Sequence, residues 1–245
     1  MVEVGVEDDA VSAQRRYYSE TADDYDARHL LSPDEHSLAL GWLLALIKAN
    51  GFSGILDVGC GTGRCLRFLK REGLEIALKG IEPVPALRDV AMRRGLSAEE
   101  ITEGDALALP FADRSIDLVC SFGVLHHIAD HEMAVSEMSR VARKAVFISD
   151  SNNLGQGGVI ARAAKHGLRA LGLWPILNFV RTNGKGYHRS KGDGIYYSYS
   201  ILNDVPMLRR RFSELYFMGT HSSGPNLYRT ASHIAVFAQS PRDRG

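Results

Sequence analysis

The sequence predicts an α/β fold, in which a doubly wound, mostly parallel seven-stranded sheet ends in an antiparallel hairpin. From residue 55 to residue 149, short β-rich runs alternate with stretches of helical periodicity, a pattern that indicates right-handed crossovers between parallel strands. Near the C-terminus, the strand-like runs 215–218 and 233–238 are separated by turn residues instead. Such a pair indicates antiparallel strands.

The elements follow from the hydrophobic pattern in chain order. Ile55–Val58 is expected to be a buried strand, followed by a glycine loop and a helix over 64–71. A strand over 76–81, a helix over 85–94 and a weaker strand near 100–103 come next. The strand over 116–121 leads to a helix capped by Asp130, and the last parallel strand covers 146–149. A further helix is expected from a cap at Ser200 through Arg211.

Length and composition bound the protein class. A chain of 245 residues with 45% hydrophobic and 24% charged residues fits one globular domain over 15–245. The acidic leader over 1–14 is expected to be disordered. The 29 basic and 29 acidic residues balance, so we expect no nucleic-acid partner. The oligomeric state stays open.

Features that would place the protein outside the cytoplasm are missing from the sequence. The N-terminus is acidic and does not resemble a signal peptide, and the apolar run 38–47 is too short to span a bilayer. Cys60, Cys65 and Cys120 fit neither a disulfide nor a metal-ligand spacing. We therefore expect a cytoplasmic protein with reduced cysteines; no residue is assigned as a metal ligand, and metal dependence stays open.

The strongest motif is the glycine loop that follows the first strand. Glycines at 59, 61 and 63 would let a ligand lie against the backbone, and the following helix would present free N–H groups. A dinucleotide site shares this logic, but its G-x-G-x-x-G pattern requires a small residue where Arg64 stands. A tight structural turn is the alternative interpretation.

The stretch Leu56-Asp-Val-Gly-Cys-Gly-Thr-Gly63 resembles motif I of the class I S-adenosylmethionine-dependent methyltransferases, in particular the branch that acts on quinones, sterols and small metabolites. Later segments are similar to the family in the same order: Gly80-Ile-Glu82, Gly104-Asp-Ala106 and Ser121-Phe-Gly-Val-Leu-His-His127. The resemblance implies that S-adenosylmethionine is the cofactor. The residues that it assigns to cofactor binding are Asp57, Gly59, Gly61, Gly63, Glu82, Asp105, Ala106 and Ser121.

An N-terminal segment is also similar to the helix that closes over the cofactor in many family members. The resemblance adds Tyr18 and Tyr25 to the cofactor-binding residues, although Ser19 replaces the aspartate that usually follows the first tyrosine. The seven-residue spacing of the tyrosines would equally suit a core-facing helix stripe.

Methyl transfer to oxygen generally also requires loss of a proton from the acceptor. Candidate catalytic residues are His126, His127 and Asp150, the last at the end of the fifth strand. Each has a structural alternative: the histidines could pack in the cofactor loop, and Asp150 could cap the turn at 152–153.

More than sixty residues separate the fifth strand from the hairpin, where a minimal core requires one helix. Residues 151–192 contain seven Lys or Arg and no Asp or Glu, with hydrophobic residues between them. Gly172 and Pro175 are expected to divide this segment into two short helices. Because ligands bind at the carboxyl ends of parallel strands, residues 151–199 are expected to form a lid over the acceptor. Its expected substrate-binding residues are Arg181, Lys185, His188, Arg189, Tyr196 and Tyr197.

The sequence therefore predicts methyl transfer from S-adenosylmethionine to a small molecule, with O-methylation of an anionic or glycosylated metabolite as the leading hypothesis. One alternative is an isoprenoid or lipid acceptor at a membrane surface, because basic and apolar residues alternate in the lid. An NAD-dependent oxidoreductase and a non-catalytic cofactor-binding module are further alternatives. Solvation of a charged helix face is the structural alternative for the basic residues.

Overall fold

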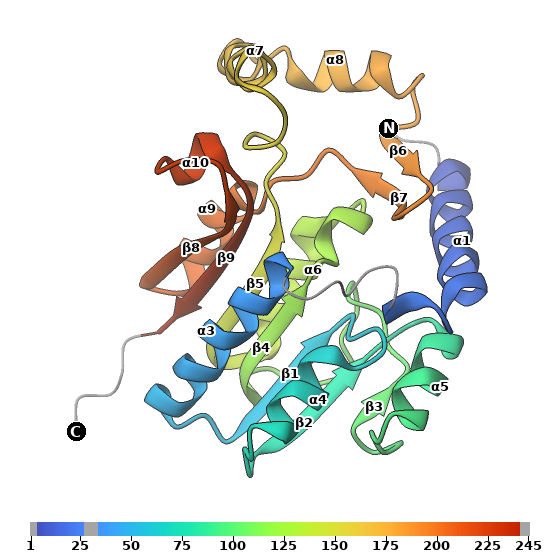
Figure 1. The fold of residues 1–245 in the computed structure, drawn as a ribbon, viewed down its shortest axis with the longest axis vertical. Helices are drawn as coiled ribbons and strands as arrows, with labels where there is room; N and C mark the ends of the chain where they lie inside the picture. Colours follow the sequence, from blue (N-terminus) through green and yellow to red (C-terminus); the bar gives the residue numbers. More distant parts are fainter. Residues whose placement is uncertain (1–3, 27–33, 241–245) are drawn as a thin grey trace.

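The computed structural model describes residues 4–26 and 34–240, and side chains from residue 10 onward. A seven-stranded sheet runs through it in the order β3-β2-β1-β4-β5-β9-β8 (Figure 1). The strands are β1 Gly54–Val58, β2 Ala77–Ile81, β3 Ile101–Thr102, β4 Ile116–Phe122, β5 Ala142–Ser151, β8 Glu214–Ser222 and β9 Ala231–Gln239.

The predicted fold class is confirmed. Strands β1 to β5 pair in parallel, and β9 pairs antiparallel with both β5 and β8. The order reverses between β1 and β4, so the loops after these two strands diverge and leave a crevice at their carboxyl ends. The glycine loop and the His126–His127 loop both lie there.

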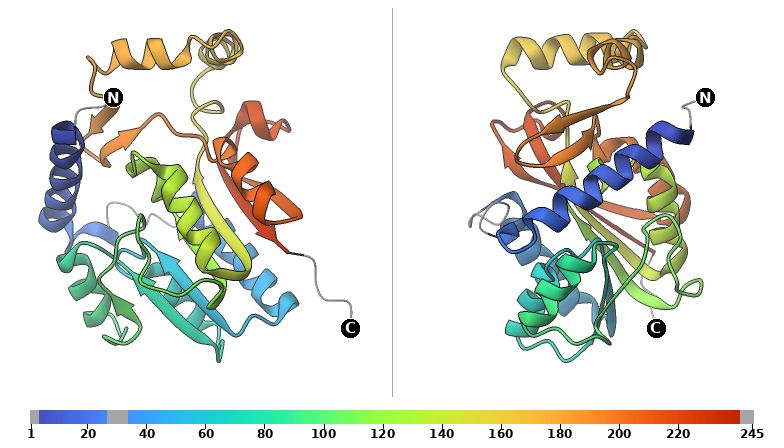
Figure 2. Two further views of the ribbon diagram at one scale, coloured as in Figure 1. Left: turned by 180° about the vertical axis from the view of Figure 1, so that it is seen from behind. Right: turned by 90° about the vertical axis from the view of Figure 1, so that its right-hand side faces the viewer.

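Helices cover both faces of the sheet (Figures 1 and 2). One face packs against α3 and α4 in a core that includes Leu43, Leu66 and Phe147. The other packs against α6 and α9 in a core that includes Met138 and Leu208. The helices are α1 Val4–Thr21, α3 Glu35–Asn50, α4 Arg64–Arg71, α5 Pro85–Arg93, α6 His131–Val141, α7 Val159–Ala170, α8 Trp174–Arg181, α9 Val205–Arg211 and α10 Leu227–Thr230, with 3-10 turns η1 Leu125–His127 and η2 Ile201–Asn203.

Side-chain caps fix where two of these helices begin. Asp130 accepts from the Met133 amide at 2.9 Å and starts α6, as the sequence predicts. Asp34 and Ser37 cap each other reciprocally at the start of α3, and Gly51 ends that helix in the left-handed conformation. The helix predicted from Ser200 to Arg211 is divided instead. Ser200 caps only the short turn η2, and Pro206 lies at the start of α9.

The expectation of a disordered leader over 1–14 is wrong where the structure describes it, because α1 already begins at Val4. The helix has tertiary partners that a disordered leader would lack. Gln14 bonds to the backbone of residues 193 and 195, and the Tyr17 hydroxyl donates to the Lys191 carbonyl at 3.1 Å. Contacts with a distant segment stabilise this helix, and local sequence does not reveal them.

The segment between β5 and α9 forms the outermost part of the structure (Figures 1 and 2). As predicted, it contains two short helices, α7 and α8, with Gly172 between them in a left-handed conformation. The glycine- and tyrosine-rich stretch that follows is more regular than the expected loop. It forms an antiparallel hairpin of β6 Tyr187–Ser190 and β7 Gly194–Tyr197.

Candidate active site

The glycine loop lies at the carboxyl end of β1 and requires glycine for two reasons. Gly59, Gly61 and Gly63 all have positive φ angles, between 54° and 76°. A Cβ on Gly59 or Gly63 would collide with Val124 or Leu96, at 2.6 and 2.2 Å. A Cβ on Gly61 would meet the Tyr25 ring at 3.7 Å, on the side of a cavity that both residues line. Gly59 also lines the cavity, but of the three glycines Gly61 is the one beside which a Cβ would meet open space and not collide with a packed side chain.

Glu82 ends β2 beside this loop and is almost fully buried. Its Oε2 accepts from the Gly61 amide at 2.9 Å and its Oε1 from the Val84 amide at 3.0 Å. Burial raises the pKa of Glu82 to about 7, against these hydrogen bonds. Each carboxylate oxygen has a second lone pair, so the group can still accept a hydroxyl from a ribose. The predicted role thus fits the local chemistry.

The remaining predicted cofactor residues differ in where they lie. Asp57 is buried, lines the cavity, and has a pKa that burial and the nearby Glu82 raise to about 7. Asp105 is half exposed and paired with Arg15 at 3.3 Å, while its neighbour Ala106 packs into the core. Ser121 is fully buried and donates to the Val58 carbonyl at 3.0 Å, so it joins β4 to β1 and does not face the cavity.

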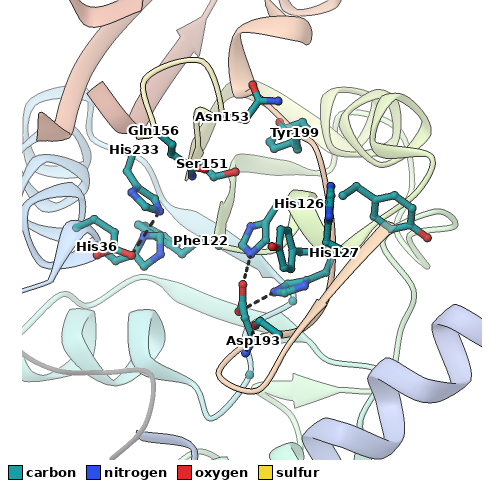
Figure 3. Close-up of a pocket in the computed structure, with 18 of the residues that line it drawn as sticks. His36, Phe122, His126, His127, Ser151, Asn153, Gln156, Asp193, Tyr199 and His233 are labelled. Atoms are coloured by element: carbon teal, nitrogen blue, oxygen red, sulfur yellow. Dashed lines mark hydrogen bonds and ion pairs between the residues drawn. The ribbon is translucent and has the colours of Figure 1, made fainter. Parts of the chain in front are cut away.

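A cavity of about 680 Å³ opens in front of the glycine loop. Its walls come from the loop itself, the start of α3, the loop after β4, and the segment that follows β5 (Figure 3). Tyr18 of α1 and Tyr25, which are expected to bind the cofactor, both line it. Of the expected substrate-binding residues, Arg181, His188, Tyr196 and Tyr197 line it too.

The other two expected substrate residues lie elsewhere. Lys185 and Arg189 border a smaller cavity of about 320 Å³ beside the β6–β7 hairpin. Because Arg181 and His188 line both cavities, the smaller one is a neighbour of the larger. The hypothesis that Lys185 and Arg189 contact the substrate therefore has no support from the main cavity.

The three predicted catalytic residues meet, but not in equivalent positions. Asp150 is fully buried and accepts hydrogen bonds from the amides of Leu125 and Ser151 and, at 2.7 Å, from the Nδ1–H of His126. It does not line the cavity, so it orients His126 and is not placed to act as a base. Burial would raise the pKa of Asp150, but His126 and these amides hold it at about 2.

The two neighbouring histidines differ in charge. Burial opposes charge on His126, yet Asp150 and Asp193 raise its pKa to about 10. For His127, burial and the charged His126 lower the pKa. Its Nδ1 lies 2.5 Å from the Ile195 carbonyl, and its Nε2 lies 2.9 Å from the Tyr18 hydroxyl.

Several cavity residues escaped the sequence analysis. Asp193, in the turn of the β6–β7 hairpin, lies 3.4 Å from Nε2 of both His126 and His127 (Figure 3). The one signal available was that it is the first acidic residue after the acid-free stretch 151–192. His36 directly precedes the apolar run 38–47, and His233 begins the strand-like run 233–238, and neither was a candidate site residue.

His36 and His233 form the opposite wall of the cavity (Figure 3). The His36 Nδ1 lies 3.1 Å from the Ser149 hydroxyl, and a Cβ on Gly123 would lie 2.9 Å from His36 Nε2. Burial lowers the pKa of both histidines, against the charge of Glu35. Both are therefore neutral near pH 7, and a neutral imidazole can accept a proton.

An ion pair holds α3 against the glycine loop. Asp34 receives two hydrogen bonds of 2.6 Å from Arg64, the first residue of α4. Burial would raise the pKa of Asp34, but Arg64 and Ser37 lower it to about 2. The pair positions Glu35 and His36, which follow Asp34 directly and line the cavity.

Comparisons with known proteins agree with this geometry. Residues 56–148 match the family model described as a methyltransferase domain. Over 102 residues the chain is 38% identical to an ajmaline N-methyltransferase of Rauvolfia serpentina, covering 38% of this chain and 34% of that one. Over 92 residues it is 38% identical to a demethylmenaquinone methyltransferase of Deinococcus radiodurans, covering 36% and 37%. The match thus spans about a third of the length of these relatives.

The likeness in fold extends much further than the likeness in sequence. The structure of a DhpI–SAH complex superimposes with a TM-score of 0.60 over 95% of this chain and 98% of that one, at 18% identity. Residues 56–148 are therefore similar in sequence to a methyltransferase domain, and the chain as a whole shares the fold of that structure.

Proposed function

We propose that this protein transfers a methyl group from S-adenosylmethionine to an oxygen of a small anionic or glycosylated acceptor. The observation that carries the proposal is the 680 Å³ cavity between the glycine loop and the basic segment after β5. Cavities of roughly 300–1,000 Å³ are typical of small-molecule sites. One enclosed space thus adjoins both a cofactor loop and a candidate acceptor wall.

The chain's own groups fit the proposed cofactor. Gly61 leaves room for a ligand against the backbone, and Glu82 retains acceptor capacity for ribose hydroxyls. The family match over 56–148 includes both residues. When bound, S-adenosylmethionine supplies a methyl group on a positively charged sulfur, which is an excellent leaving group. The protein's task is then to align an acceptor atom with that methyl group.

Positive charge at the cavity supports an anionic acceptor. The Lys165 ammonium donates to the carbonyls of Asn153 and Gln156, at 2.6 and 2.9 Å. Burial and the charges of Arg181 and Arg162 lower its pKa. Lys165 and Arg181 both line the cavity, and an acceptor carboxylate or phosphate would relieve their mutual repulsion.

Aromatic side chains on the same wall suit a ring or a sugar. His188 and Tyr196 stack across the β6–β7 hairpin, with ring centroids 5.3 Å apart and planes inclined by 23°. Both line the cavity. Loss of the acceptor proton would fall to His36, a neutral imidazole on the opposite wall.

Calorimetric titration with S-adenosylmethionine and, separately, with NAD tests the cofactor. We expect micromolar binding of S-adenosylmethionine alone, and about tenfold or greater loss of affinity in Gly61→Ala, since its methyl group would enter the cavity. Gly51→Ala is the matched control, because Gly51 has a φ of 61° and open surroundings. Binding of NAD would instead favour the oxidoreductase. If Gly61→Ala bound S-adenosylmethionine and NAD as the unmodified chain does, the glycine loop would not be part of the cofactor site.

Activity tests the acceptor. Carboxylated, phosphorylated and glycosylated phenols, with tRNA as a separate arm, would be screened for transfer of a labelled methyl group. For an anionic substrate found in this way, Arg181→Ala should raise KM at least tenfold, whereas Arg162→Ala should not, because Arg162 lies outside the cavity and bonds to Ser223. An unchanged KM in Arg181→Ala would contradict the anionic acceptor.

A lipid acceptor at a membrane surface is a second candidate, favoured by one observation. Several large apolar side chains of α7 and α8 are exposed, among them Ile160 at 86%, Ile176 at 64% and Phe179 at 61%. Apolar and basic residues together on short helices suit an anionic bilayer surface. None of the described helices is long and apolar enough to cross a membrane. Sedimentation with phosphatidylserine-containing vesicles tests this candidate, and absence of binding would remove it.

A further inference from the structure

Three side chains meet at the mouth of the cavity in an arrangement that suits a metal ion. The Nε2 atoms of His126 and His127 each lie 3.4 Å from a carboxylate oxygen of Asp193, one from each oxygen. One ligand atom from each residue lies within 4.8 Å of the others. Tetrahedral zinc with bonds of about 2.0–2.1 Å keeps its ligand atoms about 3.3–3.4 Å apart. With one carboxylate oxygen as the ligand, one of the two observed separations matches an edge of a zinc tetrahedron, and the other nitrogen lies within 4.8 Å of that oxygen.

The Nδ1 atom of each imidazole, opposite the proposed ligand atom Nε2, has a hydrogen-bond partner, as is usual for histidines that bind a metal ion. The His126 Nδ1 donates to Asp150 Oδ1 at 2.7 Å, and the His127 Nδ1 lies 2.5 Å from the Ile195 carbonyl. Such partners orient the rings with each Nε2 toward Asp193, and a metal ion would have to displace the proton that Nε2 of a charged His126 carries. Asp150 is itself anchored by the amides of Leu125 and Ser151. The Nδ1 side of each imidazole, which lies away from Asp193, is thus held by a hydrogen-bond partner of its own.

The ligands come from two separate parts of the fold. Both histidines belong to η1, which follows β4 of the central sheet, whereas Asp193 is in the turn of the β6–β7 hairpin (Figure 3). All three line the 680 Å³ cavity, so a fourth position would face the acceptor. Tyr18 lies beside it, with its hydroxyl 2.9 Å from His127 Nε2. A bound ion would tie the hairpin to the core.

A second grouping in the described part of the chain lacks these features. Asp57, Cys65 and Cys120 lie close enough to share an ion, but all three are buried. Burial raises the pKa of Cys120 well above its usual range, so the thiolate that a metal requires is disfavoured. Of the two groupings among the described residues, the histidine grouping is the one whose three members all line the cavity, since Cys120 does not.

We propose that His126, His127 and Asp193 form a site for a divalent transition-metal ion, with Zn²⁺ preferred, whose open position faces the acceptor. Two imidazoles and one carboxylate suit Zn²⁺ and other first-row ions better than Mg²⁺ or Ca²⁺, which take oxygen ligands. The ion would bind an acceptor oxygen and favour its anionic form. This last role rests on the proposed function, whereas the metal site itself does not. The sequence assigned no metal-ligating residues and left metal dependence open; Asp193 is far from the two histidines along the chain.

Zinc titration of the full chain, after removal of metals with a chelator, tests the site. We expect one equivalent of Zn²⁺ to bind by calorimetry and to remain after gel filtration, as measured by elemental analysis. Asp193→Asn should weaken binding at least tenfold, and His127→Ala should abolish it. Asp150→Asn should weaken it by about 10- to 100-fold through the orientation of His126. Mg²⁺ should not compete.

His131→Ala is the matched control, because His131 makes a similar 2.8 Å contact with Asp204 outside the cluster. It should bind zinc as the unmodified chain does. Absence of zinc binding by the unmodified chain, or equal binding by Asp193→Asn and the unmodified chain, would overturn the proposal. The cluster would then be an ion-pair lock between a charged His126 and two aspartates. S-adenosylmethionine titration of the same samples distinguishes this failure from failure of the proposed function.

Discussion

The ion pair between Asp34 and Arg64 leads to a quantitative prediction about stability. Asp34 has two roles: it caps α3 and it receives two hydrogen bonds from Arg64. Asn is as good a helix cap as Asp. The substitution Asp34→Asn therefore keeps the cap and removes the negative charge that Arg64 requires.

The magnitude follows from the lowered pKa of Asp34. The value falls from 3.8 to about 2, and one pKa unit corresponds to about 1.4 kcal/mol, which gives an upper figure of about 2.5 kcal/mol. Arg64 is 22% exposed, so solvent screens part of this energy. We expect Asp34→Asn to lower the free energy of unfolding by about 1–2 kcal/mol and Tm by about 2–6 °C.

Urea unfolding at several pH values measures this loss, with Asp130→Asn as the control. Asp130 also caps a helix, by accepting from the Met133 amide, but Asp34 is the cap that pairs with an arginine at the glycine loop. We expect the control to change the unfolding free energy by less than about 0.5 kcal/mol.

The pH dependence has a definite sign. A carboxyl group whose pKa is lowered by folding contributes stability above its unfolded value near 3.8, and this contribution is lost as the pH falls toward 2. The difference between the unmodified chain and Asp34→Asn should be constant from pH 7 to 5 and should shrink below pH 4. A loss equal to that of Asp130→Asn, or one that does not change between pH 7 and 3, would refute the assignment of the energy to the ion pair.

Two further substitutions test the loop and the cavity wall. Gly63→Ala should lower the free energy of unfolding by about 2–4 kcal/mol, because it combines a positive φ with a Cβ 2.2 Å from Leu96. The control Gly73→Ala has a similar φ but open surroundings, and it should lower the free energy of unfolding by about 1–2 kcal/mol. Thermal unfolding monitored by circular dichroism measures both losses. Equal losses would show that Leu96 does not matter. His36→Gln should lower kcat by about 10²–10⁴-fold and flatten its pH profile without changing S-adenosylmethionine affinity, whereas His221→Gln should leave kcat unchanged. Weaker cofactor binding with normal kcat would contradict a proton-accepting His36.

Local patterns were sufficient for the elements of the central sheet. Strands such as β1 and β4 are nearly continuous buried runs, and glycine loops or caps such as Asp130 separate them from helices. The same local information predicted the glycine loop, since positive φ angles at Gly59 and Gly61 are a property of single residues. Residues that act through their own backbone or their own strand can be identified in this way.

The role of a site residue could not be predicted from the sequence where that role depends on a partner distant along the chain. Ser121 belongs to a matching motif, yet its hydroxyl donates to the Val58 carbonyl across the sheet. Asp150 was a plausible base, yet burial and the amide of Leu125 make it an anchor for His126. Each outcome depends on the direction in which one side chain points, which a linear pattern does not contain.

The sequence by itself determined the α/β class, the parallel character of the first five strands, the position of the glycine loop and the basic character of the segment after β5. These depend on hydrophobic periodicity, turn residues and composition, all of which are local properties. Only the tertiary structure decided that Asp193 meets His126 and His127, and that His36 faces them across one cavity. Their meeting depends on how a hairpin and a helix pack against the carboxyl edge of the sheet, and such long-range packing is encoded in the whole chain and not in any single segment.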